Sequence, residues 1–142
     1  MMAIPHSIDE FDAVAKQALS NAIACGYASW YYWRNAYWGT KWDVFEVYTN
    51  RVNDTMVCFS FETAWNSPVC AMVELSQMFP SADIRVEYAD EDIGGGNCGW
   101  YALHSGNFVD DGFPSKGDAC INFDCDVWGY DADEYRAELE SL

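Results

Sequence analysis

Acidic residues are concentrated in the second half of this chain, where they are interspersed with aromatic residues. Residues 83–142 carry fifteen Asp and Glu against three basic residues, a net charge of −12, whereas residues 1–82 carry a net charge of −4. A disordered acidic tail is poor in aromatic residues, but Trp100, Trp128, Tyr130 and Tyr135 lie among these acids. The acidic half is therefore expected to fold and to hold its carboxylates on a defined surface.

The composition also limits which partners the protein can bind and in which compartment it is expected. With 142 residues, 51% of them apolar, the chain can form one domain with a full core. Its negative charge repels nucleic acid and anionic lipid, so direct binding to either is disfavoured. The sequence has no apolar run long enough to span a membrane, and its N-terminus lacks a basic region followed by an apolar stretch. We expect a cytoplasmic protein whose six cysteines are reduced.

The residue pattern predicts alternating helices and strands. A helix is expected over residues 7–25, with Ser7 and Glu10 as a capping box. Another is expected to begin with Ser67 as its cap and Pro68 at its first position, and to end before Pro80. A last short helix begins at Asp131. Strands are expected over residues 42–49, 55–63, 83–88, 98–104 and 118–127, with a surface loop over residues 105–117. In the third of these strands the even-numbered residues 84–88 are expected to face the core and the odd-numbered residues 83–87 to face water. This order predicts an α+β fold in which helices cover one face of an antiparallel sheet.

Two motifs carry a resemblance to a known family. They are Tyr37-Trp38-Gly39-Thr40-Lys41-Trp42-Asp43 and Phe61-Glu62-Thr63-Ala64-Trp65-Asn66-Ser67-Pro68. At this spacing the chain resembles the YubB ferredoxin-like domain family of plasmids and bacteriophages over about residues 30–105 and at Trp128-Gly129. The resemblance implies a ferredoxin-like sandwich encoded by a mobile element, and it implies no catalytic residues. We expect a single domain over residues 1–142, with an N-terminal helix (7–25), a ferredoxin-like core (30–105) and an acidic C-terminal extension (106–142).

Metal, cofactor and catalytic patterns are weak. The cysteines lack the short-spaced pairs of a zinc site and the C-x₂-C-x₂-C run of an iron–sulfur site. Residues 124–129 begin like a calcium loop, but Trp128 and Tyr135 occupy positions that need oxygen ligands. His104 and Ser105 are adjacent, which does not make a catalytic triad. We therefore expect no catalytic residues, no metal and no cofactor.

The aromatic stretch of residues 30–42 is a candidate for base stacking. Only Arg34 and Lys41 lie nearby, and base stacking is accompanied by a positively charged groove. Packing between elements is therefore favoured for these aromatic side chains.

The acidic surface is the strongest functional candidate. On a strand, Asp124 and Asp126 would point to the same side about 6.6 Å apart, and other acids would extend them into a band. Such an array resembles DNA, with one charge per about 3.4 Å of each strand. We expect an inhibitor that binds a basic nucleic-acid-binding surface of a host defence protein, such as a CRISPR effector or a restriction enzyme. The expected contact residues are Asp90, Glu91, Asp92, Asp110, Asp111, Asp124, Asp126, Asp131, Asp133 and Glu134.

Two other interpretations of the acids stay open. In one, an accessory or structural protein of a mobile element uses its acidity only for solubility. In the other, the carboxylates are the site of a hydrolase or of a metal-dependent enzyme. Trp100 and Trp128 are candidate aromatic anchors if the surface binds a partner.

Overall fold

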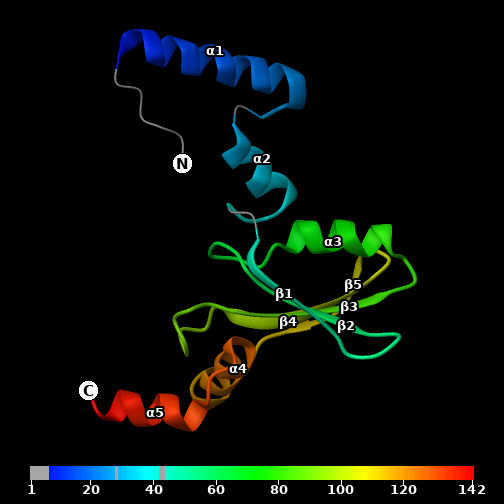
Figure 1. Cartoon of the computed structure of the whole chain (residues 1–142), viewed down its shortest axis with the longest axis vertical. Coiled ribbons are helices and arrows are strands. Elements are labelled where there is room, and N and C mark those ends of the chain that lie inside the picture. The colour runs from blue at the N-terminus through cyan, green and yellow to red at the C-terminus, as the bar shows by residue number, and fades with distance from the viewer. Residues whose placement is uncertain (1–6, 28, 42–43) are drawn as a thin grey trace. The chain divides into compact units, whose positions relative to one another are not determined.

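The computed structural model describes residues 7–27, 29–41 and 44–142 (Figure 1). The chain forms two compact units, Met1–Ala64 and Trp65–Leu142. Within the described residues, no helix is both long enough and apolar enough to cross a lipid bilayer.

The first unit contains two helices and a β-hairpin. Helix α1 (Ile8–Cys25) ends at Gly26, whose φ of 81° suits a helix C-terminus. Helix α2 (Trp30–Tyr37) contains most of the aromatic stretch. Strands β1 (Phe45–Arg51) and β2 (Val57–Glu62) pair antiparallel, as the sequence predicts. The side chain of Glu10, and with it the predicted capping box, lies outside the described residues.

The second unit is a three-stranded antiparallel sheet with three helices. The sheet order is β3-β4-β5, so β4 is central and β5 is an edge strand. The elements are α3 (Val69–Met78), β3 (Asp83–Ala89), β4 (Cys98–His104), β5 (Asn107–Gly112), α4 (Asp118–Trp128) and α5 (Ala132–Glu140).

Cross-strand pairing defines the two faces of this sheet. Ile84, Val86 and Tyr88 pair with Leu103, Tyr101 and Gly99, which places all six on one face. The Tyr101 hydroxyl on that face hydrogen-bonds the hydroxyl of Ser67, just before α3. On the other face, the Trp100 ring packs against Phe123 of α4. Helices α3 and α4 therefore lie on opposite faces (Figure 1), whereas we expected the helices on one face.

Strand β3 confirms the predicted alternation of side chains. Its odd-numbered residues Asp83, Arg85 and Glu87 are exposed, and Ile84 and Val86 between them are half-buried. The start of α3 differs by one residue from the prediction. Pro68 occupies the N-cap position, and the Ser67 hydroxyl bonds to Tyr101 instead of capping the helix.

The predicted loop at residues 105–117 is wrong at residues 107–112, which form β5. Ser105 and Gly106 both have positive φ, 49° and 77°, and His104 pairs with Asn107 across them. A two-residue turn of this kind directs the chain back along β4. Pairing with β4 then keeps residues 107–112 in a strand, although few of these residues favour strands.

The predicted strand at residues 118–127 is also wrong, because residues 118–128 form helix α4. The helix follows Gly117 and ends at Gly129, which is left-handed with φ 75°. Its buried residues Cys120, Asp124 and Cys125 recur at the spacing of one helical turn. The apolar alternation in this segment matches a strand pattern, but packing on β3 and β4 favours the helix.

Candidate functional site: the acidic surface of the second unit

All ten predicted contact residues lie in the second unit. Residues 65–142 carry sixteen Asp and Glu and only three basic residues, Arg85, Lys116 and Arg136. The predicted acids occupy four places: the β3–β4 loop, strand β5, helix α4 and the start of α5.

In the β3–β4 loop, the carboxylate of Asp90 forms hydrogen bonds within the loop, whereas the two acids that follow it are exposed. One oxygen of Asp90 accepts from the backbone N–H of Asp92, and the other accepts from the Asn97 side-chain amide, both at 3.0 Å. The indole N–H of Trp128, at the end of α4, donates to the Asp90 carbonyl at 3.0 Å. Glu91 and Asp92 are exposed. The loop acids therefore lie beside the C-terminal end of α4.

On the edge strand β5, Asp110 and Asp111 are both exposed but do not form a pair. Asp110 is opposite Ala102, and Asp111 is opposite Tyr101. Because successive side chains of a strand point to opposite faces, Asp111 lies on the face of α3 and Asp110 on the face of α4. The two acids can contact one partner surface only at the strand edge.

On α4, the predicted pairing of Asp124 with Asp126 is wrong. Successive helical residues are about 100° apart, so positions 124 and 126 point in nearly opposite directions. Asp126 is exposed, but Asp124 is only 1% exposed and lies in the core. Asp124 is therefore removed from the set of contact residues.

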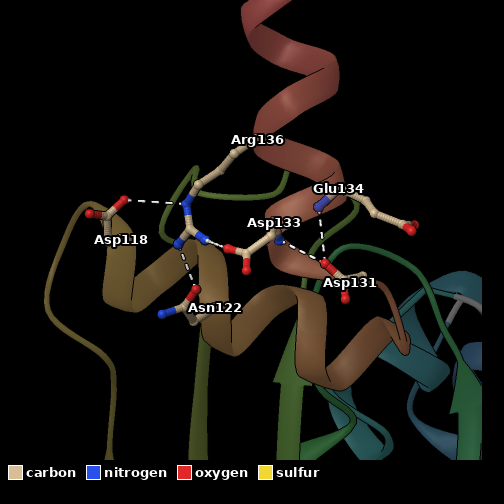
Figure 2. Close-up of polar contacts among 6 residues, drawn as sticks. All are labelled: Asp118, Asn122, Asp131, Asp133, Glu134 and Arg136. Carbon is tan, nitrogen blue, oxygen red and sulfur yellow. Dashed lines mark hydrogen bonds and ion pairs between the residues drawn. The ribbon is translucent and has the colours of Figure 1, made fainter.

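At the corner between α4 and α5, the acids take part in a polar network (Figure 2). The Asp131 carboxylate caps α5 by accepting from the backbone N–H groups of Asp133 and Glu134, at 2.9 and 3.0 Å. This cap confirms the predicted helix start. The Glu134 side chain points away from the network (Figure 2).

Arg136 of α5 connects this corner to α4. Its guanidinium binds Asp133 at 3.1 Å, Asp118 at 3.5 Å and the side-chain oxygen of Asn122 (Figure 2). The Arg136 side chain is 29% exposed, whereas Asp118 and Asp133 are 87% and 97% exposed. Sequence reasoning missed Asp118. The sequence predicted a strand there, so the favourable position of this acid in the first turn of α4 is recognised only from the structure.

Several acids remain without a cation. Within residues 7–27, 29–41 and 44–142, no basic side chain pairs with the following exposed acids: Glu91, Asp92, Asp110, Asp111, Asp126 and Glu134. Two of the three basic side chains of the unit are already engaged, Arg85 by Glu87 and Arg136 by the corner acids. We call these six residues the open acidic set.

The family of the chain follows from its match to a family model. Residues 44–137 match the model of the ferredoxin-like domain in Api92-like proteins. The chain belongs to this family. The match runs from the β-hairpin through most of α5, so the family domain includes the corner described above. No curated protein and no solved structure matches the chain.

This Api92-type ferredoxin-like domain confirms the expected α+β fold. The two motifs that carried the resemblance also meet in the structure. The Thr40 hydroxyl donates to the Ala64 carbonyl at 2.7 Å and lies 3.1 Å from the Thr63 hydroxyl. Thr40 thus fixes the end of the hairpin. Trp42 and Asp43 of the first motif lie outside the described residues.

The aromatic residues near the acids are partly engaged by the domain itself. The Trp128 ring stacks on Tyr130, with centroids 6.2 Å apart and planes at 9°. The Trp100 ring packs against Phe123, and the guanidinium of Arg85 lies 5.9 Å from its centroid. Tyr130 is 54% exposed, which makes it the aromatic side chain beside the corner acids most available to a partner.

The thiols and histidine of the domain do not form a nucleophile–base pair. Burial, a hydrogen bond to Asp124 and the neighbouring Cys120 raise the pKa of Cys98, and burial raises the pKa of Cys125. A raised pKa keeps these thiols protonated at neutral pH and weakens them as nucleophiles. His104 instead pairs with Asp83 across the sheet at 2.8 Å.

Proposed function

We propose that this protein is a non-enzymatic inhibitor that binds a basic, nucleic-acid-binding surface of a host defence protein, such as a CRISPR effector or a restriction enzyme. The open acidic set is the observation that carries this proposal. Six exposed carboxylates without a cation leave strong negative potential on a folded unit that has only three basic residues. Such potential attracts a complementary positive surface.

A DNA-mimic mechanism follows from how these acids are held. Strand β5 and helices α4 and α5 hold carboxylates on regular backbone, so little conformational freedom is lost when they bind. A basic groove that neutralises phosphates releases counterions, and fixed carboxylates can take the place of those phosphates. The inhibitor would thus compete directly with the nucleic acid for its groove.

The proposal also includes the setting. The motifs Trp38-Gly39-Thr40-Lys41-Trp42 and Thr63-Ala64-Trp65 support a YubB-type protein encoded by a plasmid or a bacteriophage. An inhibitor of a defence nuclease would act in the bacterial cytoplasm. Its partner would be the defence protein, with no direct contact to nucleic acid or membrane.

The test is a position-specific charge reversal. The triple variant Asp110→Lys, Asp126→Lys, Glu134→Lys changes three members of the open acidic set. A matched control, Asp9→Lys, Asp12→Lys, Asp54→Lys, makes the same change in net charge at exposed acids of the first unit. Each protein is expressed in bacteria with an active restriction or CRISPR system, and phage plating efficiency is measured.

We expect the wild type and the control variant to raise the phage plating efficiency. We expect the triple variant of the open acidic set to leave it unchanged. With purified defence protein, three exposed charge contacts at about 0.5–1 kcal/mol each predict binding weaker by about 10- to 100-fold. Binding should also weaken with salt and be competed by the target DNA. Equal binding by both variants, with circular dichroism showing intact folds, would refute a role for these carboxylates.

A second candidate is an accessory protein whose acidity serves solubility. The observation that favours it is that three of the predicted contact acids have structural roles. Asp90 makes hydrogen bonds within the β3–β4 loop, Asp131 caps α5, and Asp133 forms an ion pair with Arg136. This alternative predicts that both triple variants lose solubility equally and that neither affects a defence system.

A further inference from the structure

Three side chains capable of binding metal meet inside the second unit. Cys98 is the first residue of β4, and Cys120 and Asp124 lie one turn apart on α4. The two sulfur atoms are 3.5 Å apart, and the Cys120 sulfur is 3.6 Å from Oδ2 of Asp124. The three ligand atoms all lie within 4.8 Å of one another. The three residues are only 4%, 1% and 1% exposed.

The buried carboxylate is incompletely satisfied by the protein. Oδ2 of Asp124 accepts from the backbone N–H of Gly94 at 2.7 Å. Oδ1 is buried and has no hydrogen-bond partner among the described residues. The guanidinium of Arg136 is engaged by Asp118, Asp133 and Asn122. A buried acceptor left unpaired carries a desolvation cost, larger for a charged group, so Asp124 is an unusual core residue.

The separations match those around a tetrahedral zinc ion. With Zn–S of about 2.3 Å and Zn–O of about 2.0–2.2 Å, tetrahedral angles place two sulfurs about 3.8 Å apart and a sulfur and an oxygen about 3.5 Å apart. The two sulfurs are 3.5 Å apart, and the Cys120 sulfur is 3.6 Å from Oδ2 of Asp124. The third separation, from the Cys98 sulfur to the Asp124 carboxylate, is within 4.8 Å. Small side-chain adjustments therefore suffice to bring the three ligands onto one ion.

The donor set also selects the kind of metal. Thiolates favour zinc over magnesium or calcium, which prefer oxygen ligands. Two thiols would each release a proton to solvent on binding, and the ion would neutralise most of the resulting charge. Oδ2 of Asp124, which lies 3.6 Å from the Cys120 sulfur, would bind the ion while it keeps its bond to Gly94. A water molecule would complete the four ligands and could donate a hydrogen bond to Oδ1.

We propose that Cys98, Cys120 and Asp124 form a zinc site that ties strand β4 and the Gly94 loop to helix α4. A disulfide between the two cysteines is the competing explanation for the close sulfurs. It would leave Oδ1 of Asp124 without a partner, whereas a water molecule bound to the metal ion could donate to it. The site is separate from the open acidic set, so its test is independent of the proposed inhibitor function.

The experiment measures metal directly on the full chain. Protein purified without chelator is analysed for zinc by mass spectrometry, and the apo-protein is titrated with Co²⁺ while thiolate-to-cobalt absorption is recorded. We expect about one zinc per chain and a saturable thiolate band, as for a thiolate-ligated site. Cys98→Ser, Cys120→Ser and Asp124→Asn should each weaken Co²⁺ affinity by at least about tenfold.

The exposed thiols Cys58 and Cys70 provide matched controls. Cys58→Ser and Cys70→Ser should keep the zinc content and the cobalt band. Wild-type protein with negligible zinc and no saturable band would overturn the proposal, and this result does not depend on any variant folding. A Cys98–Cys120 disulfide, found by non-reducing peptide mass spectrometry in protein purified under reducing conditions, would overturn it as well.

Discussion

Asp131 combines a structural bond with a negative charge, and two substitutions separate these roles. Its Oδ1 accepts from the backbone N–H groups of Asp133 and Glu134 at 2.9 and 3.0 Å, so Asp131→Ala removes both bonds and the charge. Loss of an N-cap costs about 0.5–2 kcal/mol. Asp131→Asn keeps a carbonyl oxygen at the same place and loses only the charge, whose interaction with the helix dipole contributes about 0.3–1 kcal/mol.

The destabilisation should begin in α5. This helix has nine residues and is connected to α4 by Arg136, so an uncapped first turn also loosens the contacts of Arg136. We expect Asp131→Ala to lower the free energy of unfolding of α5 by about 1–2 kcal/mol. Asp131→Asn should cost less than half as much, because Asn and Asp are nearly equal as caps.

Hydrogen exchange of the α5 amides, followed by mass spectrometry or NMR, measures this local cost. A loss of about 1 kcal/mol corresponds to exchange about fivefold faster. Urea unfolding followed by circular dichroism tests whether the loss extends to the whole unit. Equal exchange in both variants would show that charge alone stabilises the helix start. Exchange unchanged from the wild type in both would refute the cap.

Two further changes test the packing of the second unit. Arg136→Ala should lower the free energy of unfolding by only about 1 kcal/mol, because its acidic partners are exposed and their charges are screened by solvent. Urea unfolding measures this loss, and the midpoint of Arg136→Lys should lie between those of Arg136→Ala and the wild type. Burial raises the pKa of the Tyr101 hydroxyl above 10.0 in the folded protein. As pH rises past about 10, this hydroxyl loses its proton in the unfolded chain before it does so in the folded protein, so the free energy of unfolding falls. Tyr101→Phe should make this decline shallower in urea titrations at several pH values.

Local signals in the sequence were sufficient where a residue acts on its own segment. Gly26 ends α1 and Asp131 caps α5, because both effects depend on backbone within a few residues. The alternation of Ile84 and Val86 with charged neighbours placed β3 correctly. The motifs on either side of β1 and β2 indicated the ferredoxin-like family.

Long-range packing decided what local signals could not. The period-two apolar pattern of residues 118–127 predicts a strand, but the segment is a helix packed on β3 and β4. That change moves Asp124 from the expected surface into the core. Conversely, residues 107–112 have weak strand propensity, and pairing with β4 makes them a strand.

The sequence by itself determined that this chain is an acidic α+β domain, because charge, apolar spacing and caps are properties of short segments. Only the tertiary structure decided which acids are exposed and which one is buried. It also brought Cys98 next to Cys120, 22 residues away, because β4 and α4 pack face to face. Spacing along the chain excluded a zinc site, whereas proximity in space created a candidate for one, since metal ligands need to be neighbours only in the folded protein.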